Sequence, residues 1–194
     1  CILIHYHEIA LKGKNRSWFE RRLVKNIKQQ LHGLPFSKVQ LNAARIFCFG
    51  IDESMWKDYA QRLRKVMGIK HAILMTQVKG DIDTIQSVAA AQLKELEFSS
   101  FRVSARRQYK EFHLTSQEIN ILVGKHLQSI YSKPVKLKNA DMDVVIELVK
   151  GMAYIGHERI YGFGGLPVKT SEQAISMISS GIDSPVSSFE MLKR

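Results

Sequence analysis

The chain has 194 residues, of which 45% are hydrophobic and 24% are charged, which is long enough for one or two domains with a buried core. Its aromatic content of 9% argues against a disordered or low-complexity chain. No apolar run approaches the roughly 20 residues that a membrane-spanning helix needs, and no signal-peptide pattern is found, so we expect a cytoplasmic protein with no membrane partner.

The charge points to a partner. The chain has 29 Lys and Arg residues against 18 Asp and Glu residues, which gives a net charge of +11 and a pI near 9.7. Such a basic chain usually binds a polyanion, most often a nucleic acid, although a solvated basic surface remains the alternative. Cys1 and Cys48 are too few for a disulfide framework or a four-cysteine zinc site, and the seven histidines show no metal-ligand spacing, so no metal site is assigned.

The first third of the chain predicts a compact α+β unit. Residues 2–6 form an expected buried strand, and Ser17 is the expected N-cap of a helix. Its apolar stripe and the cations of its opposite face recur at helical spacing: Phe19, Leu23, Ile27 and Leu31, against Arg21, Arg22, Lys25 and Lys28. Strands follow at 39–41 and 45–49 with a turn at Asn42 and Ala43, then a helix over 54–67 and a strand over 69–78. This order predicts a ferredoxin-like fold.

A second α/β unit is expected over about 80–160. Asp81 and Thr115 or Ser116 are the expected caps of two helices, and residues 101–106 alternate between apolar and polar as a half-buried strand does. Short strands are expected at 135–137, 144–149 and 152–160, the last two joined by a turn at Lys150 and Gly151.

The C-terminal part reads as a linker, a buried strand, a polar loop and a helix. Three glycines within residues 162–165 predict the linker, residues 174–178 the strand, 179–184 the loop and 185–193 the helix. Small residues between a strand and a helix expose backbone N–H groups that suit a pyrophosphate, whereas an ordinary serine-rich turn is the alternative.

Several motifs carry a resemblance to a known family. They are Glu8-Ile9, Leu11 to Arg16, Phe19-Glu20, Arg102-Val103, Ala105 to Arg107, Lys110, Phe112, Ser116, Glu118-Ile119, Val135 to Leu137, Asp141 to Glu147, Gly162 to Val168, Ser179 to Val186 and Met191 to Arg194. In this order they resemble the tRNA 4-thiouridine synthetases, or tRNA sulfurtransferases. The resemblance implies a ferredoxin-like domain over 1–56, an α/β THUMP tRNA-binding domain over 57–160, a linker over 161–173 and a truncated α/β PP-loop adenylation domain over 174–194.

The resemblance also implies a reaction. ATP, with Mg²⁺, adenylates a carbonyl oxygen of a tRNA uridine, and sulfur from a persulfide donor, a cysteine desulfurase, displaces AMP. It further implies a link to sulfur supply for the thiazole of thiamine, and it favours a homodimer. The residues expected at the ATP site are Met177, Ile178, Ser179, Gly181, Asp183 and Ser184. Ser180 stands where the family loop has a glycine, and the family's active-site cysteine lies beyond residue 194, so no catalytic residue is assigned and this chain alone is expected to be inactive.

Two basic clusters are the expected RNA contacts: Lys12, Lys14 and Arg16 on a loop, and Arg102, Arg106, Arg107 and Lys110 on and after a strand. With only Glu111 adjacent, the second cluster is expected to repel itself unless an anion binds, although arginines on an open sheet face can also pair with nearby carboxylates. Tyr109, and less so Trp18 and Trp56, are candidates for stacking on bases, Trp56 being expected in the core.

Two other functions remain open. One is a stand-alone tRNA-binding module whose loop has degenerated at Ser180. The other is a basic domain that binds proteins.

Overall fold

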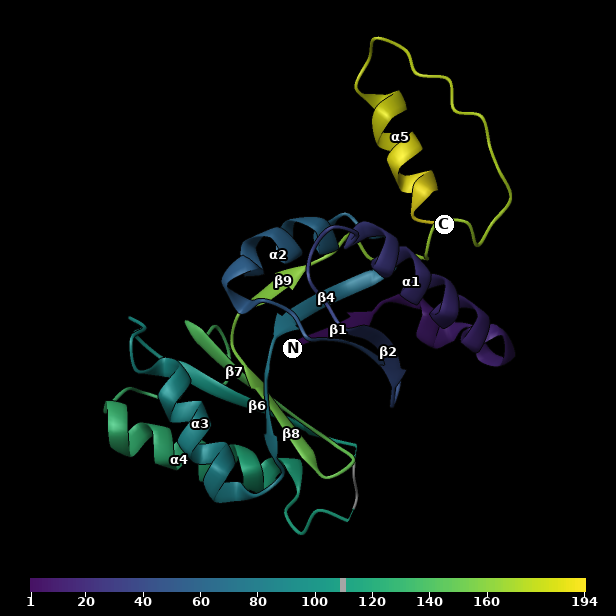
Figure 1. Ribbon diagram of the computed structural model, residues 1–194. Helices are drawn as coiled ribbons and strands as arrows, with labels where there is room; N and C mark the ends of the chain where they lie inside the picture. The colour runs from purple at the N-terminus through teal and green to yellow at the C-terminus, as the bar shows by residue number, and fades with distance from the viewer. Residues whose placement is uncertain (109–110) are drawn as a thin grey trace. The chain divides into compact units, whose positions relative to one another are not determined.

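The computed structural model describes residues 1–108 and 111–194 and divides into two compact units (Figure 1). The first comprises Cys1–Ile73 together with Arg159–Arg194, and the second is Leu74–Glu158. Both units combine helices with a sheet, as the sequence predicts.

The described part of the first unit is built on a five-stranded sheet in the order β2-β3-β1-β4-β9. Helices α1 and α2 lie on one face of this sheet (Figure 1). The elements are β1 (Ile2–Tyr6), α1 (Arg16–Gln30), β2 (Lys38–Asn42), β3 (Arg45–Phe49), α2 (Trp56–Arg64), β4 (Ile69–Leu74) and β9 (Arg159–Tyr161). The first six give the expected ferredoxin-like order, and β9 pairs antiparallel with β4 at the edge.

The predicted apolar stripe of the first helix is confirmed. Leu23, Ile27 and Leu31 are fully buried and Phe19 is 9% exposed, so the stripe anchors α1 to the sheet. Burying each such side chain contributes roughly 1.5–3 kcal/mol. The expected cap at Ser17 is wrong, because the 3-10 turn η2 (Gly13–Asn15) runs directly into α1, which begins at Arg16 with no side-chain cap.

Two strands that the sequence joins are divided in the structure. The expected strand over 69–78 is β4 in the first sheet and β5 (Thr76–Lys79) in the second, separated at Met75. The expected strand over 152–160 is likewise β8 (Met152–Gly156) and β9. Apolar β-branched runs look alike in either sheet, so local pattern gives no sign of the point at which the chain changes sheets.

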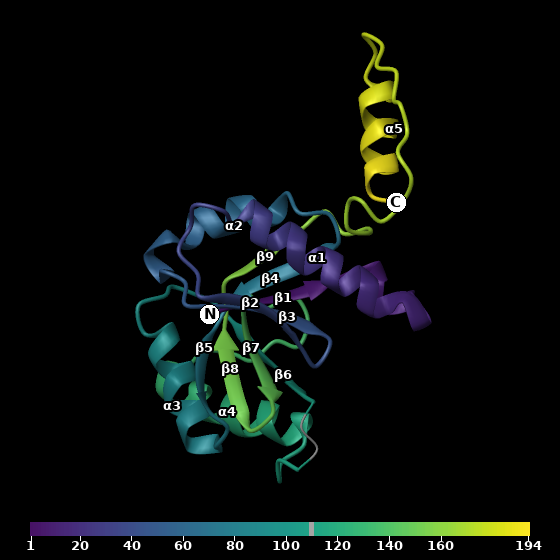
Figure 2. The same ribbon diagram turned by 45° about the vertical axis from the view of Figure 1, so that its right-hand side comes forward.

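The described residues of the second unit form a sheet in the order β5-β8-β7-β6, in which β6 and β7 run parallel (Figure 2). Helices α3 and α4 contribute to one core with β6, β7 and β8. The bounds of the elements not yet given are α3 (Ile82–Leu93), β6 (Phe101–Arg107), α4 (Ser116–Tyr131) and β7 (Met142–Val149).

Both predicted caps of these helices are confirmed. The Asp81 carboxylate accepts a hydrogen bond from the Thr84 N–H at 2.8 Å, and this bond lowers the pKa of Asp81. Thr115 and Glu118 form a reciprocal capping box at the start of α4. The β7–β8 hairpin turns at Lys150 and Gly151, as expected, and both have positive φ.

Other local expectations are corrected. The β2–β3 turn is centred on Ala43 and Ala44, both at positive φ, one residue later than predicted. Residues 135–137 form only a single bridge, from Val135 to Phe101. Residues 174–178 form no strand among the described residues, and Ile175 is 98% exposed, because a buried parallel strand needs neighbouring strands on both sides.

Candidate RNA interface and phosphate loop

The loop between β1 and α1 presents two of its three predicted cations outward. It consists of the short turns η1 (Glu8–Leu11) and η2. Lys14 is exposed, and the half-buried Lys12 places its Nζ 5.2 Å from the centre of the Phe19 ring. Gly13 has a φ of +48°, a conformation that favours glycine, so the turn holds the two lysines on either side of it. Both ammonium groups are placed to meet an anion from solvent.

Arg16, the third predicted cation, has a different environment. Its Nε donates to Glu20 Oε1 at 2.8 Å, and its Nη2 donates to the Tyr6 hydroxyl. The Tyr6 hydroxyl in turn donates to Glu20 Oε1 at 2.6 Å, and Glu20 is only 6% exposed. Burial, reinforced by the hydrogen bond to Glu20, raises the pKa of Tyr6 to about 12. The Arg16 guanidinium therefore compensates a buried carboxylate and ties the start of α1 to β1.

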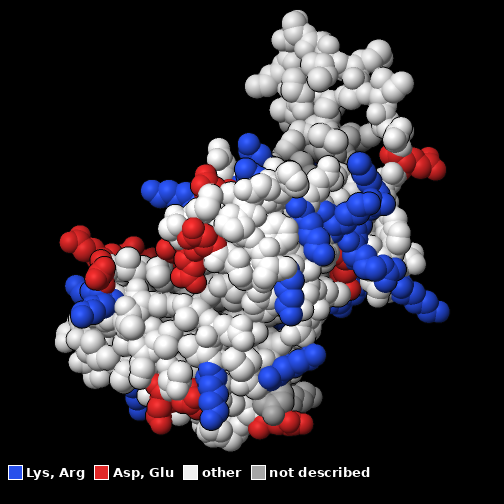
Figure 3. All heavy atoms as spheres, in the orientation of Figure 1, with Lys and Arg blue, Asp and Glu red and all other residues white. Residues whose placement is uncertain are grey.

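The outer face of α1 carries a cationic surface that includes an aromatic ring. Trp18, Arg21, Arg22 and Lys25 line a shallow hollow, and Trp18 is 44% exposed. Figure 3 shows Lys and Arg side chains gathered over α1. We call these four residues the α1 face. The helical spacing correctly put the three cations opposite the apolar stripe, and the same spacing of i, i+3, i+4 and i+7 is the signal that places Trp18 beside them.

In the second unit, two of the four predicted cations have internal partners. Arg102 Nη2 lies 2.7 Å from Asp143 Oδ2, and the Ser104 hydroxyl donates to the other oxygen of Asp143 at 2.6 Å. Arg107 Nη1 donates to the carbonyl oxygens of Phe112 and Leu114, at 2.7 and 3.1 Å. Arg102 thus pairs with a carboxylate of the protein, the alternative that is open to an arginine on a sheet face.

Arg106 differs from its neighbours on β6 because it is exposed. It is therefore the cation of this strand that is placed to meet a phosphate. The other two candidates here, Lys110 and Tyr109, lie outside the described residues.

The loop over 179–184 is organised by its own serines. The Ser179 N–H donates to Ser184 Oγ at 2.9 Å, and the two hydroxyl oxygens lie 3.1 Å apart. The Gly181 N–H points to Ser179 Oγ at 3.4 Å. Helix α5 (Asp183–Leu192) begins within this loop, two residues earlier than expected, and N–H groups in the first turn of a helix have no intrahelical acceptor. The arrangement offers hydroxyl and N–H donors at the positive end of a helix dipole, as an anion site requires.

Ser180 fits this loop without backbone strain. In the part of the chain that the structure describes, Ser180 is not among the non-glycine residues with positive φ. A side chain at this position therefore does not force the left-handed conformation that serine disfavours. Met177 and Ile178, the other predicted ATP-site residues, are 90% and 68% exposed.

The two cysteines differ in burial. Cys48 lies in β3, is fully buried, and burial raises the pKa of its thiol to about 11. Cys1 is half-buried at the start of the chain. Across residues 1–108 and 111–194, no group of three or more His, Cys, Asp or Glu side chains is arranged to hold a metal ion. No helix in those same ranges has the length and apolar character needed to cross a membrane.

Comparison with known proteins agrees with this geometry. Three family models match in chain order: the ThiI ferredoxin-like domain at residues 1–72, the THUMP domain at 79–158, and thiamine biosynthesis protein (ThiI) at 169–194. A protein of Geobacillus thermodenitrificans named "Probable tRNA sulfurtransferase" is 37% identical over 196 residues, covering 100% of this chain and 49% of the relative. The chain belongs to the tRNA 4-thiouridine synthetase family.

Two solved structures match over the whole chain. A 4-thiouridine synthetase crystallised with RNA and bound ATP is 31% identical with a TM-score of 0.78, and the match covers 100% of this chain and 50% of that one. A protein from Pyrococcus horikoshii, also 31% identical, has a TM-score of 0.83 over 100% of this chain and 65% of that one. The chain thus spans about half the length of the curated family members it matches.

Proposed function

We propose that this chain binds tRNA and carries the first part of an ATP site for sulfur transfer to a tRNA uridine, forming 4-thiouridine. The observation that carries the proposal is the whole-chain match to a 4-thiouridine synthetase whose structure contains RNA and ATP. The exposed cations on both units and the serine-lined loop before α5 support it, since they offer the two chemistries that such a reaction needs.

The RNA surface is proposed to include Lys12, Lys14, the α1 face and Arg106. These cations lie on a loop, on the outer face of a helix and on a strand, so they are suited to contacting phosphates rather than base edges. Double-stranded RNA is recognised mainly by shape, phosphates and 2′-hydroxyls. The exposed ring of Trp18 adds a place for an unpaired base to stack. Arg16, Arg102 and Arg107 are proposed to support this surface, since their guanidinium groups are held by protein atoms.

At the loop, the donors of Ser179, Gly181 and Ser184 are proposed to hold the pyrophosphate part of ATP. Asp183, at the first position of α5, would face the accompanying Mg²⁺. ATP supplies the chemistry that turns the uridine carbonyl oxygen into a leaving group, as AMP, which sulfur from a persulfide donor displaces. A cysteine desulfurase as that donor, a homodimer and sulfur supply to the thiamine thiazole belong to the same proposal.

The test of RNA binding is a titration of the 194-residue chain with tRNA at several salt concentrations. We expect binding that weakens steeply as salt rises, because the contacts are with phosphates. Equal affinity at low and high salt, or no binding at low salt, contradicts the proposal.

The test of chemistry is AMP formation from ATP in the presence of tRNA and a persulfide sulfur donor, by this chain and by a form that continues through the rest of the adenylation domain. We expect AMP only from the longer form, and a loss of it on Asp183→Ala. A longer form that binds tRNA but makes no AMP favours the alternative of a tRNA-binding module with a degenerate loop.

A further inference from the structure

The glycine-rich segment after β9 is packed into the first unit. The N–H groups of Gly162 and Gly164 donate to the carbonyl oxygens of Lys70 and Ile69, at 3.1 and 2.9 Å, and the Gly68 N–H donates to the Gly164 carbonyl at 2.7 Å. Gly164 and Gly165 are buried and have φ values of +71° and +70°. The segment thus continues the hydrogen bonding of the sheet edge and ends in a turn that only glycines adopt without strain.

The C-terminal end of α5 rests on this turn. The Leu166 N–H donates to the Lys193 carbonyl at 2.8 Å. A Cβ atom on Gly165 would lie 2.3 Å from the same carbonyl oxygen, so the approach leaves no room for a side chain. The Ser171 hydroxyl donates to the Arg194 carbonyl at 2.7 Å, which closes the intervening segment back onto the end of α5.

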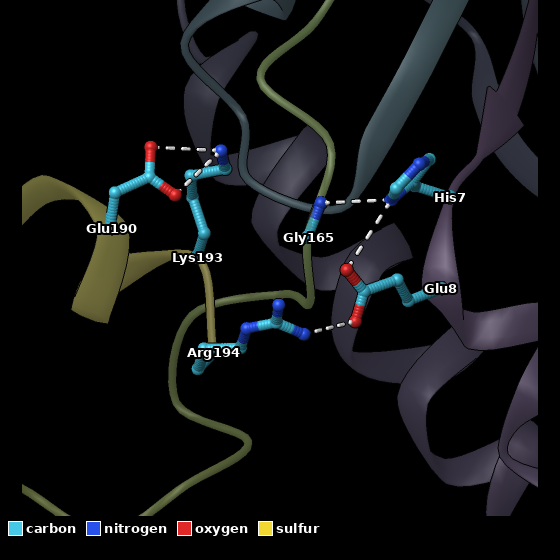
Figure 4. A network of polar contacts seen from close by, with 6 residues as sticks. All are labelled: His7, Glu8, Gly165, Glu190, Lys193 and Arg194. Atoms are coloured by element: carbon cyan, nitrogen blue, oxygen red, sulfur yellow. Dashed lines mark hydrogen bonds and ion pairs between the residues drawn. The ribbon is translucent and has the colours of Figure 1, made fainter.

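Charged side chains join the end of α5 to the first turn after β1. Arg194 Nη1 lies 2.9 Å from Glu8 Oε2, and the other Glu8 oxygen lies 3.6 Å from His7 Nδ1 (Figure 4). The same His7 nitrogen accepts a hydrogen bond from the Gly165 N–H at 3.3 Å. Glu8 therefore connects the first turn after β1 to the end of α5 through Arg194, while the neighbouring His7 connects the same turn to the glycine turn by accepting the Gly165 N–H.

We propose that Glu8 and Arg194 are positioning residues that fix α5 on the ferredoxin-like domain. Because the phosphate loop leads directly into α5, a helix about 15 Å long, fixing its far end limits where the loop can lie relative to α1. The contact thereby couples the RNA-binding surface of this unit to the ATP loop. This inference rests on the proposed function, since the spacing matters only if RNA and ATP bind these two places.

Lys193 and Glu190 provide the matched control. Their ion pair, 3.0 Å long, lines the same pocket, but both residues belong to the end of α5 and the pair does not reach the ferredoxin-like elements. Glu190→Gln removes the same charge as Glu8→Gln without breaking a contact between α5 and the rest of the unit.

The first experiment measures amide hydrogen exchange at Leu166 and Gly165 in the 194-residue chain. We expect Glu8→Gln and Arg194→Gln each to speed exchange about two- to fivefold, the range for one solvent-accessible ion pair. The double variant should match either single variant, because both remove one interaction. Unchanged exchange, additive effects, or the same effect from Glu190→Gln overturns the proposal.

The second experiment uses the longer form with a complete adenylation domain. We expect Glu8→Gln to lower kcat for tRNA-dependent AMP formation while the Kd for tRNA is unchanged, and Glu8→Arg combined with Arg194→Glu to restore part of kcat. Gly165→Ala, which forces the turn and α5 apart, should lower kcat further, and Glu190→Gln should not change it.

The outcomes separate the two proposals. A longer wild-type form that neither binds tRNA nor makes AMP refutes the proposed function. A working wild type whose kcat is insensitive to Glu8→Gln and Gly165→Ala refutes the positioning role alone, and so does a Glu8→Gln variant that loses tRNA affinity but not kcat.

Discussion

Replacing two cations of the α1 face tests whether this helix contacts RNA. Arg21 and Lys25 are exposed, so changing both to Ala should alter the free energy of unfolding by less than about 0.5 kcal/mol per site. Removing one cation that neutralises a phosphate lowers the slope of log K against log salt by about 0.9, which between 50 and 200 mM salt is about a 3.5-fold change. For two such cations, the ratio of the Kd values at those two salt concentrations should shrink about twelvefold.

The assay is a tRNA titration at both salt concentrations, accompanied by thermal melting. The control is the double change Lys57→Ala and Arg64→Ala, which removes the same charge from exposed positions on α2. If the control shrinks the ratio as much as the α1 variant does, binding follows net charge and α1 does not touch the RNA. If the α1 variant keeps the wild-type ratio, the assignment of this face to RNA is refuted.

Individual side chains support three further predictions. Arg106→Ala should weaken tRNA binding and leave the melting temperature unchanged. Arg107→Ala should lower the free energy of unfolding by about 1–3 kcal/mol, because two backbone carbonyls lose their donor. Equal melting temperatures of the two variants contradict this distinction. Since the pKa of Tyr6 is raised to about 12 in the folded chain, its contribution to stability is complete below about pH 10 and is lost as pH rises toward 12. In chemical denaturation, the Tyr6→Phe variant should therefore lose less stability than the wild type between these pH values. Equal losses would count against the buried contact of Tyr6 with Glu20. Cys48, whose pKa is about 11, should resist alkylation at pH 8.5 until the chain is unfolded, as mass spectrometry can show, and rapid labelling of the native chain would exclude the buried position.

Local patterns predicted most of the elements because the forces behind them are local. The stripe from Phe19 to Leu31, the cap at Asp81 and the turn at Lys150 each depend on neighbours within a few residues. The switch between sheets at Met75 does not, because either sheet accepts the same apolar strand.

The residues of the candidate site likewise divide into those that local sequence determines and those that the tertiary fold determines. The sequence predicted Lys12 and Lys14 on a loop, where the structure has them, but the guanidinium of Arg102 meets Asp143, which lies 41 residues away in sequence. Only the parallel pairing of β6 with β7 brings these two residues opposite each other. Whether a cation is available to RNA therefore depends on the tertiary fold, which spacing alone does not encode.

The first unit is discontinuous in sequence, because its edge strand β9 follows the second unit along the chain. The Leu74 N–H donates to the Glu158 carbonyl at 3.2 Å, so the two ends of the intervening segment lie next to each other. Insertions with adjacent ends can be excised or transplanted at little cost to their host, since a short bridge restores the chain. Residues 75–157 are thus a segment that can be removed or transplanted as a whole. Ending the chain at residue 158, by contrast, would remove β9 and leave the edge of β4 unpaired and prone to aggregation.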